Sequence, residues 1–248
     1  MLHLLAFGAH PDDVELAVGG TICSLTRAGY KVGVVDLTRG ELGTRGTSEL
    51  REEEAHNAAE IMGLEVRENL EIPDGQIGNI QQNQLRVIRS VRRHRPHIAL
   101  IGAPECRHPD HGAGTRLCAE SFFYAGLAKV ETFEEDGSPQ EPWRPHHVLH
   151  YMQSIPFEPT FVVDVSLVWE QRMKAMQAFR SQFYNPDYEV DEPETFVSNK
   201  GFFEWVEARA RTYGYRIGAT YGEPLLYRHG PVGVKNLMDV LKDEKPFR

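Results

Sequence analysis

Imidazole and carboxylate side chains are concentrated in two short segments, His-Pro-Asp-Asp at 10–13 and His-Pro-Asp-His at 108–111. Each segment directly follows an apolar run, at 2–7 in the first case and at 98–102 in the second. Neutral imidazole and carboxylate are the usual ligands of a catalytic zinc ion, which binds three side chains and keeps a fourth position for water. Two histidines and one carboxylate also suit ferrous iron. The sequence therefore predicts one metal site built from both segments.

The ligands that we expect are His10, Asp13 and His111. His10 and Asp13 are three positions apart, so one helical turn can aim both at the same point. A bound metal ion would lower the pKa of its water from 15.7 toward about 7 and so supply hydroxide to attack a carbonyl. Asp12 neighbours a ligand but must point elsewhere, which makes it the candidate general base. His108 is the candidate group that faces the oxyanion.

Other interpretations of these residues are open. An aspartate after a strand is often a helix N-cap, and a histidine beside proline is often a loop residue, so the first segment alone is ambiguous. Asp110 is as readily the N-cap of the next helix as the hydrogen-bond partner of His108. Cys106 is an alternative ligand, although such a cysteine is more often a buried apolar filler. His147 and His150 fall on opposite faces of a strand and do not suit a common metal.

Arg39, Arg45 and Arg51 follow the second expected strand, in a glycine-rich loop and at the start of the next helix. In a parallel sheet that loop lies at the same edge as the two metal-binding segments. The guanidinium group matches a carboxylate with two hydrogen bonds, so the three arginines predict an anion pocket. For each arginine alone, the alternative is an ion-paired or solvated side chain; Arg51 would then pair with Glu54 or Glu41.

Strand-like and helix-like segments alternate along the chain, a pattern that predicts an α/β fold with right-handed βαβ units. The Gly19–Gly20 pair inside the first helix predicts that another part of the chain packs closely there. The arginines at 86–93 predict a solvated helix face. The expected strands are 2–8, 31–37, 65–70, 97–102, 147–152, 160–165 and 223–227, and the expected helices are 14–29, 49–62, 82–94, 111–130, 167–183, 202–213 and 232–241.

Length and composition narrow the class of protein. The 248 residues are within reach of one large α/β domain, 1–248, with 41% hydrophobic and 25% charged residues. The net charge of −9 argues against a general nucleic-acid binder. We expect no signal peptide and no membrane segment. The three cysteines, without CxxC spacing, predict reduced thiols in the cytoplasm.

The first strand is followed by Gly-Ala-His-Pro-Asp-Asp rather than by a GxGxxG turn. Carboxylates at this position repel a pyrophosphate, so the pattern argues against a dinucleotide site.

The two His/Asp segments resemble those of the LmbE-like, or PIG-L, family of N-acetylglucosaminyl deacetylases. The glycine-rich segment 38–46 (TRGELGTRG), together with RENL at 67–70, PDG at 73–75 and SQFYN at 181–185, is most similar to the bacillithiol-pathway subgroup. Members of that subgroup remove acetate from N-acetylglucosaminyl malate. The resemblance extends to about Tyr184 and leaves the 131–144 insertion without a matching motif.

This resemblance implies a Rossmann-like three-layer sandwich with a mostly parallel sheet, a zinc or ferrous ion, and a homo-oligomer, commonly a hexamer. It implies the same metal ligands, with Asp12 as base and His108 as its electrostatic or acid partner. It further implies that Arg51 holds a substrate carboxylate and that Tyr184 approaches the oxyanion. The remaining alternatives are a deacetylase for chitobiose or a mycothiol precursor, and a metal-free sugar- or nucleotide-binding module.

Overall fold

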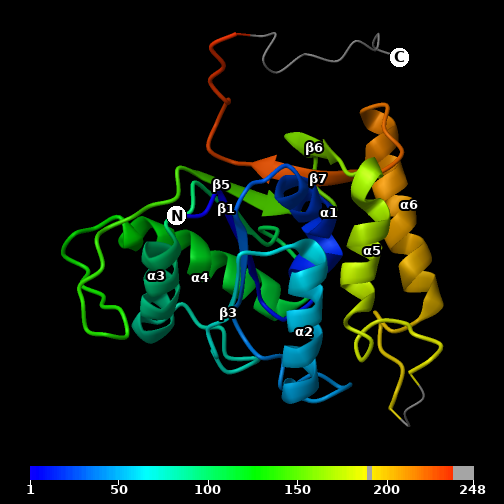
Figure 1. Cartoon of the computed structure of the whole chain (residues 1–248), viewed down its shortest axis with the longest axis horizontal. Coiled ribbons are helices and arrows are strands. Elements are labelled where there is room, and N and C mark those ends of the chain that lie inside the picture. Colours follow the sequence, from blue (N-terminus) through cyan, green and yellow to red (C-terminus); the bar gives the residue numbers. More distant parts are fainter. Residues whose placement is uncertain (189–191, 237–248) are drawn as a thin grey trace.

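The computed structural model describes residues 1–188 and 192–236 and contains a seven-stranded sheet between two layers of helices (Figure 1). The strand order is β3-β2-β1-β4-β5-β7-β6. The first five strands in this order are parallel, whereas β7 is antiparallel to β5 and β6. The predicted α/β, Rossmann-like three-layer fold is thereby confirmed. The strands are β1 Leu4–Gly8, β2 Val32–Asp36, β3 Val66–Asn69, β4 Ile98–Ile101, β5 His147–Tyr151, β6 Phe161–Asp164 and β7 Gly222–Tyr227.

Helices cover both faces of the sheet, and each layer has its own apolar core. Helices α1, α2, α5 and α6 form one layer and α3 and α4 form the other (Figure 1). Because both faces are covered, the central strands β1 and β2 are buried along their whole length. The helices are α1 Asp13–Arg27, α2 Ser48–Met62, α3 Gln81–His94, α4 Pro109–Ala125, α5 Trp169–Gln177 and α6 Lys200–Arg216, with a short 3-10 helix at Ser166–Val168.

Helix α4 ends at Ala125, five residues before the predicted end, because an arginine binds the carbonyl groups that follow. Arg92 of α3 donates from Nε to the Ala125 carbonyl at 3.0 Å and from Nη2 to the Leu127 carbonyl at 2.9 Å. Its side chain is buried, so the predicted solvated arginine face is wrong at this position. A guanidinium group offers five N–H donors and can therefore replace several helical hydrogen bonds.

Helix α1 is kinked at Val18, whose φ of −141° and ψ of 18° are not helical. A Cβ on Gly20 would lie 2.8 Å from Oε1 of Glu223 and equally close to Val165, so only glycine fits. The predicted close packing at this glycine pair is confirmed. Glycine pairs are common sites of sharp helix kinks.

Charged side chains from late in the chain bind the backbone groups that the kink releases. Glu223 of β7 accepts a hydrogen bond from the Gly20 N–H at 2.9 Å. The Leu16 carbonyl accepts from Nη2 of Arg172 at 2.5 Å and from Nη2 of Arg209 at 3.4 Å. Arg172 Nε also lies 3.7 Å from the Glu223 carboxylate. This group, which we call the kink cluster (Glu223, Arg172 and Arg209), joins α1 to β7, α5 and α6.

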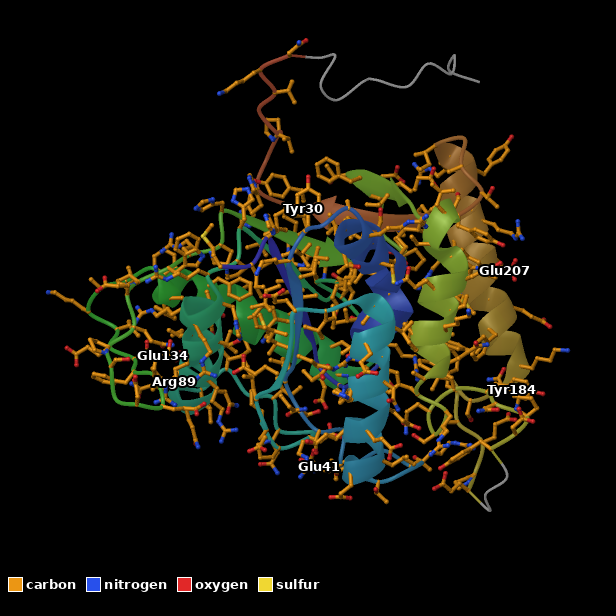
Figure 2. The ribbon with its side chains drawn as sticks, in the orientation of Figure 1. Tyr30, Glu41, Arg89, Glu134, Tyr184 and Glu207 are labelled. Atoms are coloured by element: carbon orange, nitrogen blue, oxygen red, sulfur yellow. The ribbon has the colours of Figure 1, made fainter. Side chains whose placement is uncertain are left out.

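The 131–144 insertion packs against α3, next to Arg89 (Figure 2). Gln140 donates to the Arg89 carbonyl at 3.1 Å, and Trp143 Nε1 donates to the Pro96 carbonyl at 2.9 Å. Pro96 precedes β4. These contacts therefore lie toward the amino end of β4, whereas the predicted site follows its carboxyl end.

Two expectations concern other parts of the chain. None of the helices in the described ranges combines the length and apolar character that a bilayer-spanning segment needs. The helix expected at 232–241 falls partly outside the described residues, and the described part, 232–236, is not helical.

Candidate metal centre

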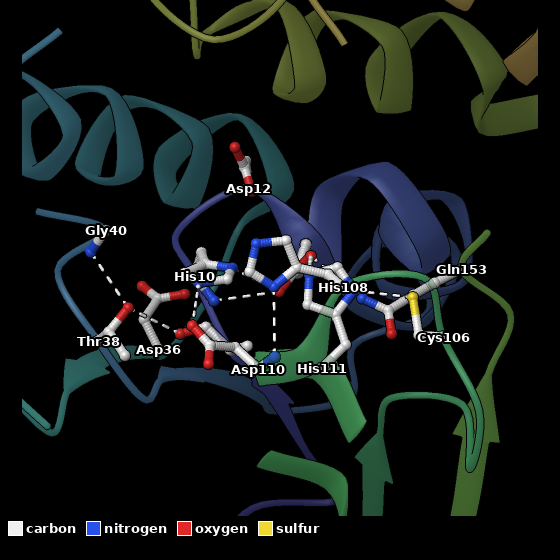
Figure 3. A network of polar contacts seen from close by, with 12 residues as sticks. His10, Asp12, Asp36, Thr38, Gly40, Cys106, His108, Asp110, His111 and Gln153 are labelled. Atoms are coloured by element: carbon white, nitrogen blue, oxygen red, sulfur yellow. Dashed lines mark hydrogen bonds and ion pairs between the residues drawn. The ribbon is translucent and has the colours of Figure 1, made fainter. Parts of the chain in front are cut away.

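The segments that follow β1 and β4 meet at one edge of the sheet because these strands are parallel neighbours. His10 lies after β1 and Asp13 begins α1, whereas His108 caps α4 and His111 lies in its first turn. Figure 3 shows the three imidazole rings side by side. One ring nitrogen of each lies within 4.8 Å of the other two. The structure thus brings the predicted histidines together.

Asp13 links the two imidazoles that were predicted as ligands. Its Oδ1 lies 3.1 Å from Nε2 of His111, and its Oδ2 lies 3.7 Å from Nδ1 of His10. The carboxylate is fixed from behind, because Gln153 Nε2 donates to Oδ1 at 3.1 Å and the His10 N–H donates to Oδ2 at 3.0 Å. Two imidazoles and one carboxylate therefore converge at the strand ends.

The electrostatics of this group favour a cation. Burial lowers the pKa of His111, but the Asp13 carboxylate and Cys106 together outweigh burial and raise that pKa to about 10. Burial likewise lowers the pKa of His10, yet the carboxylates of Asp110, Asp13 and Asp74 raise it well above its ordinary value. Positive charge is thus stabilised at both rings. A divalent ion supplies that charge, and imidazole nitrogen with carboxylate oxygen fits zinc or ferrous iron.

Asp12 adopts a backbone conformation that is costly for any residue with a side chain, with φ of 122° and ψ of −24°. Such strain is of the order of 1–3 kcal/mol and is typical of functional sites. Burial raises the pKa of the Asp12 carboxyl to about 7, against the opposing effect of Arg51. Figure 3 shows its side chain pointing away from the imidazole rings. The candidate base is therefore separate from the candidate ligands.

Two predictions around α4 need correction. His108 is the N-cap of α4, since its Nδ1 accepts from the Asp110 N–H at 3.3 Å. Asp110 is therefore not the N-cap, and it bonds His108 through its backbone N–H, whereas its carboxylate lies 3.3 Å from Nε2 of His10. Cys106 is not an apolar filler, because its Sγ lies 3.0 Å from Nδ1 of His111. Burial raises the pKa of the Cys106 thiol, but its hydrogen bonds with His111 and Ser154 lower that pKa to about 6.

Arg51 is buried and contacts the candidate base. Its Nη2 donates to Oδ2 of Asp12 at 3.4 Å and to the side-chain oxygen of Gln182. It makes no ion pair with Glu54 or Glu41, the acidic neighbours considered from the sequence, among the described residues. Arg51 is therefore placed to hold the Asp12 carboxylate in position.

The other predicted substrate residues lie at different places. Arg45 donates from Nε to the Ser181 carbonyl at 2.8 Å, and Arg39 pairs with Glu52 at 3.4 Å. Both cations thus have protein partners. Tyr184 lies on the connection between α5 and α6 and is half-exposed (Figure 2). The roles of Arg45 and Tyr184 in substrate binding stay predictions.

Two side chains of the centre were not predicted from the sequence. Asp74 contributes an oxygen 3.1 Å from Nε2 of His10, although its Pro-Asp-Gly context predicts only a turn. Gln153, which follows β5, holds Asp13. Two signals were available. Both residues follow strands, and such residues gather at the same sheet edge; Asp74 also lies in the PDG segment at 73–75 that contributes to the family resemblance.

Known proteins resemble this chain in sequence and fold. The family model described as PIG-L, GlcNAc-PI de-N-acetylase, matches residues 5–122, which include both His/Asp segments. The crystal structure of the conserved protein TT1542 from Thermus thermophilus is 36% identical with a TM-score of 0.82, covering 95% of this chain and 98% of that one. The diacetylchitobiose deacetylase of Thermococcus kodakarensis is 28% identical over 241 residues, 92% of this chain and 83% of that protein.

The fold also occurs with a different chemistry. The 4-carboxy-2-hydroxymuconate hydratase GalB of Pseudomonas putida KT2440 has a TM-score of 0.74 at 22% identity, covering 95% of this chain and 99% of that one. At this identity the likeness concerns the fold alone, so activity has to be argued from the site. The family match and the likeness to the Thermus protein over nearly the whole chain agree with the resemblance carried by the two His/Asp segments. This chain belongs to the PIG-L, or LmbE-like, family.

Proposed function

We propose that this protein is a metal-dependent deacetylase that hydrolyses the N-acetyl group of N-acetylglucosamine conjugates. The observation that carries the proposal is the convergence of His10, His111 and Asp13 at the end of two parallel strands, with carboxylates that favour a cation. The family match supports the reaction class. A metal-free binding module would gain nothing from these buried acids, which are costly to keep.

In the proposed reaction His10, Asp13 and His111 hold the ion. When bound, a zinc or ferrous ion lowers the pKa of a coordinated water and polarises the amide carbonyl. Asp12 takes a proton from the attacking water at its carboxylate and gives it to the amine that leaves as the C–N bond breaks, and Arg51 holds that side chain in place. His108, the most exposed of the three histidines, donates a hydrogen bond to the oxygen on which negative charge develops.

The proposed substrate is N-acetylglucosaminyl malate of bacillithiol biosynthesis, supported by the resemblance of segment 38–46. Conjugates of the chitobiose and mycothiol-precursor types are the alternatives, and relatives named as deacetylases of such conjugates resemble the chain as well. A single domain, a homo-oligomeric assembly and a cytoplasmic location remain part of the proposal. Three free cysteines, two of them buried, support a reducing compartment.

The deciding experiment is a substrate panel with the purified full-length protein. We expect acetate and a free amine from N-acetylglucosaminyl malate, and slower release from diacetylchitobiose and N-acetylglucosaminyl inositol. The hydratase substrate 4-carboxy-2-hydroxymuconate serves as a control and should remain unchanged. Hydration of that compound without any deacetylation would overturn the proposal.

Removal of the metal should abolish hydrolysis. Treatment with a chelator followed by its removal should leave an inactive protein, and zinc or ferrous iron should restore activity, because the ion polarises the reacting carbonyl. Protein treated with chelator already saturated with zinc is the control. Full activity in protein shown to be free of metal would contradict the proposed chemistry.

Substitution of Arg51 should impair all substrates to a similar degree. The sequence alone predicts that Arg51→Ala selectively weakens binding of a malate carboxylate, but the contact with Asp12 changes this expectation. Loss of a charge-assisted hydrogen bond costs about 1.5–3 kcal/mol, or roughly 10- to 150-fold in kcat/KM. Arg216→Ala, which removes an exposed ion pair at the end of α6, is the matched control. A loss confined to N-acetylglucosaminyl malate would show instead that Arg51 binds the aglycone.

A further inference from the structure

We propose that Asp74 is a positioning residue of the metal centre. Together with Asp110 it holds a proton on Nε2 of His10 and so keeps Nδ1 of that ring free to bind the ion. This inference rests on the proposed function, because it assumes that His10 is a ligand. The inference goes beyond the proposed function because it states which nitrogen of His10 binds the ion and that Asp74 determines this choice.

The contacts of the His10 ring determine where its proton lies. Nε2 lies 3.1 Å from Oδ1 of Asp74 and 3.3 Å from Oδ2 of Asp110. An ionised carboxylate is only an acceptor, and a neutral imidazole has one N–H and one bare nitrogen. Two carboxylates at Nε2 therefore place the N–H there. The bare nitrogen is Nδ1, which lies on the side of Asp13, 3.7 Å from its Oδ2.

Asp74 is itself held rigidly by the chain. Its Oδ2 accepts from the Leu42 N–H at 3.0 Å, and its Oδ1 accepts from the Gly75 N–H at 2.9 Å. Its own N–H donates to Oε1 of Glu41 at 2.8 Å. The side chain is buried. A fixed carboxylate behind a ligating histidine sets the tautomer and orientation of the ring, and raises its basicity toward the metal.

The same contacts connect the glycine-rich loop to the metal ligand. Leu42 and Glu41 belong to segment 38–46, and both bind Asp74. A displacement of the Leu42 backbone, which donates to the Asp74 carboxylate, is therefore transmitted to His10, whereas Glu41 binds only the Asp74 backbone N–H. The loop thereby gains a second role, besides any contact with substrate.

Asp74 has one competing role, that of a ligand. One oxygen each from Asp74 and Asp110 and a His10 nitrogen lie within 4.8 Å of one another, which is close enough to share an ion. As a ligand, Asp74 would be as necessary for metal binding as His10. If Asp74 is a positioning residue, its substitution should weaken metal binding by a smaller factor than substitution of His10 does.

The test measures zinc affinity of the full-length protein by competition with a chromophoric chelator, without substrate. Asp74→Asn is the informative variant, because the asparagine oxygen can still accept from the Leu42 N–H while its NH2 group faces Nε2 of His10. That donor drives the imidazole proton onto Nδ1. We expect the zinc affinity of Asp74→Asn to fall about 10- to 100-fold. The melting temperature of the metal-free variant should stay close to that of the parent. The double variant Asp74→Asn with Asp110→Asn should lose more zinc affinity than the single variant.

Glu41→Ala is the matched control. It removes the acceptor for the Asp74 N–H and so disturbs the turn, but leaves both carboxylates on His10. We expect little change in its zinc affinity. An equal loss in Glu41→Ala and Asp74→Asn would show that only the turn matters, and the positioning role would be rejected.

The remaining outcomes also decide the question. Unchanged affinity in Asp74→Asn overturns the inference while leaving the proposed function intact. A complete loss of zinc, equal to that of His10→Ala, would make Asp74 a ligand and reject the positioning role. Absence of zinc binding in the parent protein would remove the proposed function itself, a result that the parent titration reveals on its own.

Discussion

Replacement of Asp12 by asparagine should lower kcat by about 10²–10⁴-fold, the usual contribution of a general acid–base group. Stoichiometric metal should remain, because the Asp12 carboxylate points away from the imidazoles and contacts Arg51. Asp136→Asn, an exposed site on the 131–144 insertion, controls for the chemical change and should leave the activity unchanged. If Asp12→Asn loses its metal instead, Asp12 is the ligand and Asp13 the base.

A second variant separates the chemistry of Asp12 from its backbone strain. Asp12→Gly also lacks the carboxylate, but glycine accepts the observed φ of 122° at little steric cost. Relief of strain of about 1–3 kcal/mol, less roughly 0.5–1 kcal/mol for the added backbone freedom, should make Asp12→Gly more stable than Asp12→Asn. Urea denaturation of both proteins measures this difference. Equal stability would mean that the surrounding chain relaxes the strain.

Replacement of Glu223 by alanine should cost about 3–5 kcal/mol of the free energy of unfolding, as is typical when one partner of a buried charged group is removed. The buried Glu223 carboxylate accepts from the N–H groups of Gly20 and Thr21 and faces Arg172. Without it, the backbone groups lack an acceptor and the arginine lacks its counter-charge.

Glu158→Ala is the matched control for this stability measurement. Glu158 forms an exposed ion pair with Arg216, and such pairs are largely offset by solvation. Its removal should barely move the urea midpoint. A Glu223→Ala protein as stable as Glu158→Ala would show that the kink cluster contributes no net stability, as happens for some buried ion pairs whose desolvation cancels their attraction.

The sequence predicted the features that depend on local pattern. Apolar runs located every strand except β3, which is mostly polar, and the Gly19–Gly20 pair correctly indicated a close approach. The histidines could be grouped because parallel strands end at a common edge. These inferences need only the hydrophobic periodicity of helices and strands and the rule that parallel strands end at the same edge of a sheet.

The sequence did not predict partners that depend on three-dimensional approach. Arg92 lies in an arginine-rich helical stretch, and nothing local indicates that it binds carbonyl groups beyond α4. Arg51 has acidic neighbours along the chain but contacts Asp12, 39 positions away. Asp74 resembled an ordinary turn residue. A long charged side chain can reach several partners, so the partner that it contacts depends on the fold and not on spacing along the sequence.

The kink cluster also bears on how the protein is made. Gly20 and Glu223 are 203 positions apart, which a ribosome covers in roughly 10–40 s at about 5–20 residues per second. All the proposed ligands have been synthesised once His111 is complete, yet the bend in α1 has no acceptor for its N–H groups until β7 follows. Helix α1 can therefore reach its final bend only after β7 has been synthesised.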